Sequence, residues 1–203
     1  MKGIVCVFSA FIITLNLSYS QVNDSTNTGT FTDVRDGKTY KTVQIGKQTW
    51  MAENLSYNPG NGSWAYDNNS SNEAIYGRLY NWETAKTVCP SGWHLPSDSE
   101  WTQLTDYLGG EDIAGGKLKE NGTSHWNPPN AGATNETGFT ALPGGSYYYG
   151  TFSYIGRYDT WWSSTELNPI YAWYRIMSFG SSSVLRYYSN EESGFSVRCL
   201  RDL

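Results

Sequence analysis

The sequence predicts one irregular, aromatic-rich α+β domain. Short segments of β-type alternate with stretches rich in Gly, Asn and Ser, and one segment carries a clear helix start signal. The chain also holds nine Trp and sixteen Tyr, together with 21 Gly and only 16% charged residues. Because aromatic side chains bury large areas, they can stabilise a fold whose regular elements are short.

The first twenty residues have the pattern of a secretory signal peptide. A positive start precedes the apolar run Ile4–Leu17, and small residues occupy Ser18 and Ser20. We therefore expect residues 1–20 to be removed before Gln21, and the mature protein to be extracytoplasmic (periplasm, outer surface or medium). The alternative, a membrane anchor, needs about 20 apolar residues and is disfavoured by the shorter run. The polar residues 21–30 are expected to form a flexible tether.

Residues 31–203 are expected to form the single folded domain. The formal charge of the whole chain is −5, and Lys and Arg are not clustered. This distribution argues against nucleic acid or an anionic membrane as a partner. No second long apolar stretch follows the first, so membrane insertion is not expected. The sequence gives no indication of the oligomeric state.

The domain begins with a predicted β-hairpin. Phe31–Arg35 and Lys38–Ile45 have strand character and flank Asp36-Gly37, which is typical of a tight two-residue turn. Thr49–Leu55 is expected to be a third strand. The following Ser56–Asn72 is dense in Asn, Ser and Gly and is expected to be a loop.

Helices are predicted in the middle of the chain. Ser97–Glu100 has the composition of a capping box, and the apolar residues after it recur at helical spacing until Gly109. A shorter helix is expected up to Val88, capped by Asn81, and a weaker one over Asp112–Lys119. The later chain is expected to consist of short strands, at Gly138–Ser146, Trp161–Glu166, Tyr171–Phe179, Ser183–Tyr188 and Gly194–Leu200.

Two of the three cysteines, Cys89 and Cys199, remain once Cys6 leaves with the signal peptide. In an exported chain they are expected to form one disulfide. The alternative, a metal-binding or nucleophilic pair, is disfavoured by the oxidising compartment.

Six segments, taken together and in this order, resemble a family of bacterial secreted proteins, the Fibrobacter succinogenes major paralogous domain. They are Val43–Leu55, Tyr76–Trp82, Cys89–Trp101, Thr137–Gly145, Trp162–Glu166 and Gly194–Cys199. The combination covers most of residues 31–203, whereas each segment alone is a weak signal.

That family in turn resembles the formylglycine-generating enzymes, a branch of the C-type-lectin-like fold. His94–Trp101 echoes the Arg-Leu-Pro-Thr-Glu-Ala-Glu-Trp motif of those enzymes, and Pro143–Ser146 echoes their Arg-Gly-Gly-Ser. The resemblance implies an irregular, mainly antiparallel sheet with two main helices and long loops. It also implies that Cys89 and Cys199 join the helical region to the last strand.

Enzymatic activity is not expected. The copper-binding cysteines of the formylglycine-generating enzymes follow the Gly-Gly-Ser segment, whereas Tyr147–Tyr154 contains no cysteine. Tyr and Ser cannot replace a thiolate as a soft copper ligand. His94, at a helix entrance, is expected to be a packed, hydrogen-bonded residue. His125 is expected to be exposed in a loop and could contribute to a ligand site, but no Ser or Cys nucleophile motif accompanies it. We therefore predict no catalytic residue and no cofactor.

A metal site is not expected either. The segment Asp67–Glu73 begins with alternating oxygen donors, as a calcium loop does. It lacks the central Gly, and Arg78 stands where the closing Glu belongs. A solvated loop is the preferred interpretation.

Consecutive aromatic residues are the remaining candidates for function. They occur as Tyr147–Tyr149, Trp161-Trp162, Trp173-Tyr174 and Tyr187-Tyr188. Successive side chains of a strand face opposite ways, so one member of each pair points into the core and the other outward, unless loops cover both. The candidate ligand-binding residues are Trp126, Tyr148, Trp162 and Trp173.

Three functional hypotheses follow. The first is a non-catalytic binding module whose ligand is a glycan or a cell-surface protein, because exposed Trp and Tyr suit both. The second is a structural or interaction protein of the envelope without a small ligand. A glycan-acting enzyme is the third and least favoured; it requires a pair of carboxylates about 5–10 Å apart in a cleft.

Overall fold

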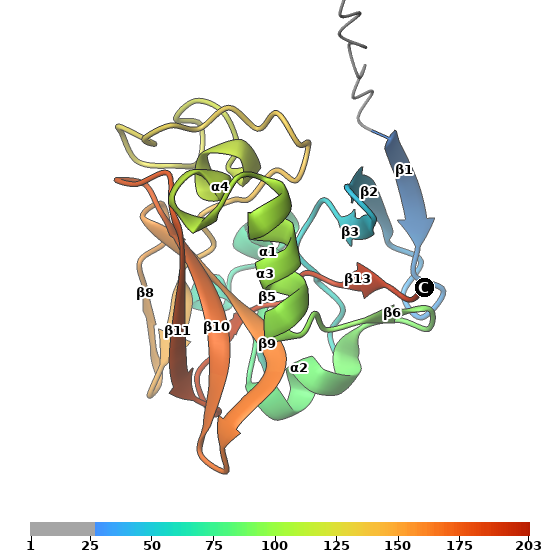
Figure 1. The fold of residues 1–203 in the computed structure, drawn as a ribbon. Coiled ribbons are helices and arrows are strands. Elements are labelled where there is room, and N and C mark those ends of the chain that lie inside the picture. Colours follow the sequence, from blue (N-terminus) through green and yellow to red (C-terminus); the bar gives the residue numbers. More distant parts are fainter. Residues whose placement is uncertain (1–26) are drawn as a thin grey trace, which may run out of the picture.

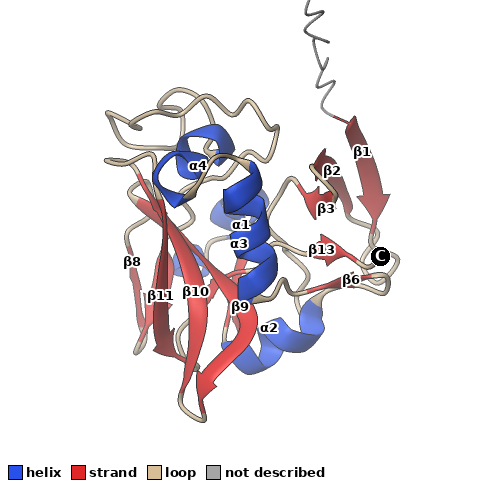
Figure 2. Ribbon diagram, in the orientation of Figure 1, coloured by secondary structure: helices blue, strands red, loops and turns tan. Residues whose placement is uncertain are grey.

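The computed structural model describes residues 27–203, which form a mixed α+β fold with two larger sheets and one small hairpin sheet (Figures 1 and 2). Neighbouring strands are antiparallel, except for the β12–β9 pair, which is parallel. The predicted signal peptide, residues 1–20, lies outside the described residues.

The five-stranded sheet has the order β1 (Asn27–Thr32), β2 (Thr39–Ile45), β3 (Gln48–Met51), β13 (Leu200–Arg201) and β6 (Trp93–His94). The six-stranded sheet has the order β11 (Val184–Asn190), β10 (Tyr171–Ser178), β9 (Tyr158–Asn168), β12 (Phe195–Ser196), β5 (Arg78–Tyr80) and β4 (Ser63–Ala65). The small hairpin pairs β7 (Ser146–Tyr148) with β8 (Thr151–Ser153). The segment before Ser146, expected to be a strand, is instead loop with an isolated bridge at Ala141.

The first hairpin differs from the sequence prediction in two ways. Its last pair is Thr32 with Thr39, so residues 33–38 form a six-residue connection and not a two-residue turn. The backbone N–H of Asp33 donates to Lys38 O, and the Asp33 carboxylate binds Arg35, which stabilises the longer loop. Strand β1 also starts at Asn27, so the expectation of a tether was wrong for residues 27–30, which pair with β2.

The helix start signals are confirmed. Helix α3 (Asp98–Tyr107) begins with a full capping box between Ser97 and Glu100. Helix α2 (Trp82–Val88) is capped by the side chain of Asn81, which accepts from Thr84 N. Helix α4 (Glu111–Leu118) begins one residue before the predicted start at Asp112.

Residues 56–72 were expected to be a loop, but part of this segment is ordered into regular structure. It contains β4, a 3₁₀ turn at Tyr66–Asn68 and the start of α1 (Ser70–Tyr76). The Asn69 side chain accepts from Ser71 N and caps α1, which illustrates that an Asn-rich segment can begin a helix as well as a loop. Residues 27–203 therefore contain four α-helices, not two main ones. None of the helices in residues 27–203 is long and apolar enough to cross a membrane.

Helices α3 and α4 cover one face of the six-stranded sheet (Figure 1). The core beneath them is built from fully buried aromatic side chains of several elements. The ring centroids of Trp50 and Trp101 are 4.7 Å apart, and those of Trp101 and Trp161 are 6.2 Å apart. Burial of these large rings is a main source of stability for a fold with short elements.

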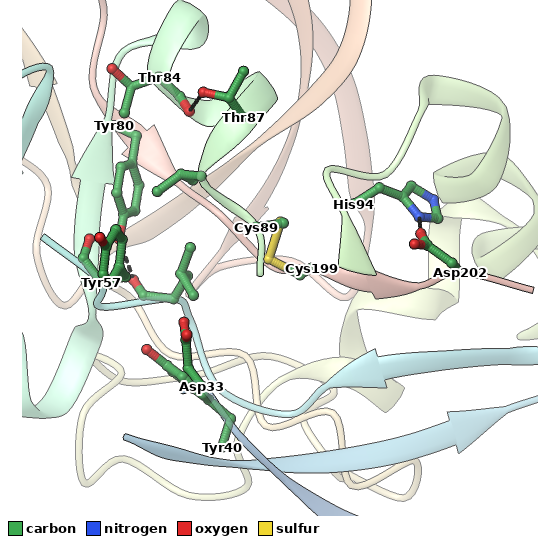
Figure 3. The surroundings of a disulfide bond; sticks show 12 residues. Asp33, Tyr40, Tyr57, Tyr80, Thr84, Thr87, Cys89, His94, Cys199 and Asp202 are labelled. Carbon is green, nitrogen blue, oxygen red and sulfur yellow. Dashed lines mark hydrogen bonds and ion pairs between the residues drawn. A yellow bond between two sulfur atoms is a disulfide. The ribbon is translucent and has the colours of Figure 1, made fainter. Parts of the chain in front are cut away.

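A disulfide and a polar network join distant parts of the chain. Cys89, directly after α2, is bonded to Cys199, directly before β13, which confirms the predicted pairing (Figure 3).

In the core, Asn54 donates to Asp159 and accepts from Arg198 and Trp161. Burial raises the pKa of Asp159 to about 7 and lowers the pKa of Arg198 to about 9. These hydrogen bonds satisfy polar groups that would otherwise destabilise the core.

Candidate ligand-binding groove

The face of the six-stranded sheet opposite α3 carries a groove of about 390 Å³. Its size lies within the range of small-molecule sites. It is bordered by the β7–β8 hairpin, by the face of β9–β11 and by the turn between β10 and β11. The lining residues are Ser146, Tyr148, Tyr154, Tyr158, Thr160, Tyr174, Ile176, Ser178, Ser181, Ser183, Leu185 and Tyr187.

The alternation of side chains along β10 and β11 separates the groove from the helix-covered face. Tyr174 pairs with Tyr187 across the two strands, and Ile176 pairs with Leu185. All four side chains line the groove. The intervening residues point the other way, because successive strand residues face opposite sides of a sheet.

Contacts of the intervening residues confirm the assignment of faces. The Arg175 guanidinium donates to Asp98 O and to Thr102 Oγ1 of α3, at 3.0 and 2.8 Å. Arg186 Nε lies 2.9 Å from both carboxylate oxygens of Asp98. The charged side chains of this part of the sheet therefore belong to the helix side, and the groove is left with aromatic, aliphatic and hydroxyl groups.

Two tyrosines of the groove, Tyr148 and Tyr174, are shifted toward the neutral form. Burial raises the pKa of Tyr148 and of Tyr174, whose hydroxyls hydrogen bond to each other. No lining residue carries a carboxylate, imidazole, amine or guanidinium group. The groove therefore presents ring faces and hydroxyl dipoles, but no formal charge.

A buried lysine holds one end of the groove. Lys119 is fully buried, and its Nζ donates to the carbonyls of Ser178, Ser181 and Ala131 at 2.9, 2.7 and 3.0 Å. Ser178, at the end of β10, and Ser181, in the turn after it, both line the groove. Fixing this turn reduces the conformational entropy that a ligand would have to remove on binding.

Tyr154 lies at the groove in a backbone conformation that side chains rarely adopt. Its φ is +73°, and its carbonyl accepts from the backbone N–H of Arg157 and Tyr158. The ring contacts Tyr158 edge-on and is half exposed. Non-Gly residues with positive φ cost about 1–3 kcal/mol and cluster at functional sites.

The structure places one of the four predicted ligand-binding residues in the groove, one on the helix side of the sheet and two in the core. Tyr148 lines the groove. Trp173 is half-buried on the helix side, where the Arg186 guanidinium lies 3.4 Å from its ring centroid. Trp126 and Trp162 are almost fully buried, and their Nε1 groups donate to the carbonyls of Ala141 and Tyr80. The prediction of a ligand surface was wrong for these two tryptophans, because each satisfies its one polar atom inside the fold.

The sequence prediction missed most of the groove. Tyr154, Tyr158, Tyr174 and Tyr187 line it but were not selected. The signal was present for two of them, since Tyr174 and Tyr187 belong to the aromatic pairs. Choosing the outward member needed the register of β10 against β11, which the sequence does not contain.

The two histidines lie away from the groove and are held by acidic partners. His94 Nδ1 and Nε2 contact Asp202 and Glu100 at 2.6 and 3.0 Å (Figure 3 shows the Asp202 contact). His125 Nδ1 lies 2.9 Å from Glu120 Oε1. Within residues 27–203, no group of three or more His, Cys, Asp and Glu side chains is arranged to hold a metal ion.

Comparison with known proteins gives one match. The model of the Fibrobacter succinogenes major domain matches residues 43–201. No curated protein and no solved structure matches the chain. The matched range includes every residue that lines the groove.

Proposed function

The chain belongs to the Fibrobacter succinogenes major domain family, and we propose that it is an exported, non-catalytic module that binds neutral glycans in the tyrosine groove. The observation that carries this proposal is the composition of the groove. Five tyrosines line it together with hydroxyl and aliphatic side chains, and no charged side chain does.

These groups match the chemistry of a sugar. The apolar faces of pyranose rings stack on aromatic rings, while tyrosine, serine and threonine hydroxyls donate and accept hydrogen bonds from sugar hydroxyls. An anionic sugar would lose hydration in the groove without gaining a cationic partner, which is unfavourable. The groove therefore favours neutral glycans over uronates and sulfated sugars.

We assign the fold to the C-type-lectin-like class, in the branch of the formylglycine-generating enzymes. The closing strand β12 and the disulfide to Cys199 support this assignment. In place of copper-binding cysteines, the segment after Gly144-Gly145 forms the β7–β8 hairpin with its three tyrosines. Export by the predicted signal peptide is compatible with the disulfide.

A protein partner is the second candidate. Its support comes from the other face of β10 and β11, where Tyr171 and Tyr188 are exposed and their rings lie 5.7 Å apart. Leu167 and Ile170, at the β9–β10 turn, are also exposed. Tyrosine and apolar side chains together are typical of protein interfaces.

A binding screen tests the proposal. Purified residues 21–203 should bind saturably to at least one neutral polysaccharide on a glycan array or in a pull-down with insoluble polysaccharides. Binding should be unchanged by EDTA, because no metal site is proposed. A folded protein that binds only anionic glycans, or none, would refute the proposal and favour the protein partner.

A further inference from the structure

A second aromatic hollow lies beside the groove, at the other face of the β7–β8 hairpin. It measures about 220 Å³ and is lined by Trp64, Tyr147, Tyr149, Gly150, Asn190, Glu192 and Ser193. It shares no lining residue with the groove. Ligand pockets for drug-sized molecules are usually 300 Å³ or larger, so about one sugar ring is the appropriate size for this hollow.

Three consecutive tyrosines connect the hollow with the groove. Tyr148 lines the groove, whereas Tyr147, the preceding residue of β7, points to the opposite face of the hairpin and lines the hollow. Tyr149 follows at the hairpin tip, with φ of +45° and 87% of its surface exposed. The triplet therefore places Tyr148 in the groove, Tyr147 in the hollow and Tyr149 at the hairpin tip, where it also lines the hollow.

The wall of the hollow is a fixed feature of the fold. The rings of Trp64 and Tyr147 are stacked, with centroids 4.3 Å apart and an interplanar angle of 23°. Tyr147 and Gly194 exchange two backbone hydrogen bonds of 2.9 and 2.8 Å. A Cβ on Gly194 would lie 2.9 Å from Tyr147 Cβ and 3.1 Å from Trp64 Cε3, so the stack requires glycine here.

The polar groups of the hollow suit sugar hydroxyls. Glu192 is exposed and is the one charged residue of the lining. A carboxylate accepts hydrogen bonds from two neighbouring hydroxyls. The Asn190 Oδ1 accepts from Glu192 N, which ties the backbone of the acidic residue to the hollow. A flat aromatic stack with a carboxylate at its edge offers one ring face and one hydrogen-bond acceptor to a single sugar.

We propose that the hollow is a second subsite for the same glycan chain, which runs from the groove past Tyr149 to the Trp64–Tyr147 stack. This inference rests on the proposed function of the groove. It makes the ligand an oligosaccharide or polysaccharide and not a single sugar. Two linked contacts raise affinity by about 10²–10⁴ when the linker spans both sites.

The test is calorimetric titration of residues 21–203 with bioses, tetraoses and hexaoses of the cello-, manno- and xylo- series. The series that binds should bind about 10-fold or more tightly as the hexaose than as the biose. Tyr149→Ala and Glu192→Ala should remove most of this gain for the hexaose and leave biose affinity unchanged. Both side chains are exposed, so the variants are expected to fold, as a thermal unfolding curve verifies. Tyr107→Ala, an exposed tyrosine of α3, is the matched control.

The outcomes separate the two proposals. Equal affinity of the biose and hexaose, or hexaose binding unaffected by both variants, would overturn the second subsite while leaving the groove intact. If no series binds, or if Tyr187→Ala leaves the affinity unchanged, the proposed function of the groove fails and this inference fails with it.

Discussion

Aromatic residues beneath α3 and aromatic residues that line the groove play opposite roles. Under α3, Trp101 and Trp161 are completely buried, whereas Tyr154 and Tyr187 on the open face are each about half exposed. Seven of the nine tryptophans are buried, namely Trp50, Trp82, Trp93, Trp101, Trp126, Trp161 and Trp162. Tryptophan therefore builds the core of this protein, and tyrosine, whose hydroxyl tolerates water, supplies its open surface.

Removing a buried ring beneath α3 should have the largest effect on the free energy of unfolding. Trp161→Ala deletes a fully buried ring that also donates to Asn54. It should lower the free energy of unfolding by about 3–5 kcal/mol, as measured by guanidinium denaturation. A loss below about 1 kcal/mol would mean that the covered face does not carry the stability assigned to it.

The open face should respond in the opposite manner. Tyr187→Ala should weaken glycan binding about 10-fold or more, since one stacked ring contributes on the order of 1–3 kcal/mol in known aromatic–ring stacking with bases. It should change stability little, because the side chain is half exposed.

A neighbouring tyrosine is the matched control. Tyr188 is equally exposed and follows on the same strand, but it faces Trp173 on the other side of the sheet. Tyr188→Ala should keep glycan affinity unchanged. Equal loss of affinity in both variants would place the binding surface elsewhere.

Removing the N-terminal cap of α3 tests whether the stability of this helix affects glycan binding. Ser97→Ala removes the hydroxyl that caps α3 and should cost about 1 kcal/mol of stability. Because α3 lies on the covered face, glycan affinity of the folded protein should not change. A parallel fall in affinity would show that the two faces are coupled through the sheet.

The smallest expected effect is the contribution of His94 to the pH dependence of stability. Burial lowers the pKa of His94, but its hydrogen bonds to Asp202 and Glu100 outweigh burial, and the net pKa is raised. A raised pKa in the folded state contributes stability that is complete below the unfolded value of 6.5 and is lost as pH rises through the folded pKa. Since the imidazole is substantially exposed, the effect should be a few tenths of a kcal/mol.

Urea unfolding at several pH values checks this prediction. His94→Gln should remove this contribution alone, so the difference in stability between the original protein and the variant should shrink as pH rises above about 6. Glycan affinity of the original protein should not follow the titration of His94, because this histidine does not line the groove. A pH-dependent affinity would argue that a charged side chain takes part in binding.

The sequence predicted those parts of the fold whose signals are local. The Ser97–Glu100 capping box, the Asn81 cap and the Cys89–Cys199 pair each depend on a few residues, and all three are confirmed. The Asp-Gly hairpin was placed correctly along the chain, but its loop length was wrong. There, the Asp33–Arg35 ion pair stabilises a longer connection than the two turn residues suggest.

The site could not be predicted to the same extent, because it depends on long-range pairing. Tyr174 pairs with Trp162 of β9 and with Tyr187 of β11, so the register places all three rings on one face. Trp162 is buried there against Phe195 of β12, a contact between segments distant in the sequence. Trp126 is buried within a long loop region, where its Nε1 donates to Ala141 O. The sequence of this region has no periodic pattern that would predict the burial. A future interpretation of such aromatic-rich sequences should favour tyrosine over tryptophan as the surface residue.

Hydroxyl-radical footprinting with and without the tightest-binding array glycan tests the central claim most directly. The groove account predicts that the glycan protects Tyr154 and Tyr187 from oxidation, while the equally exposed Tyr188 and Tyr107 keep their reactivity. Protection of Tyr171 and Tyr188 with unchanged oxidation of Tyr187 would contradict it, and would place the binding surface on the opposite face of the sheet.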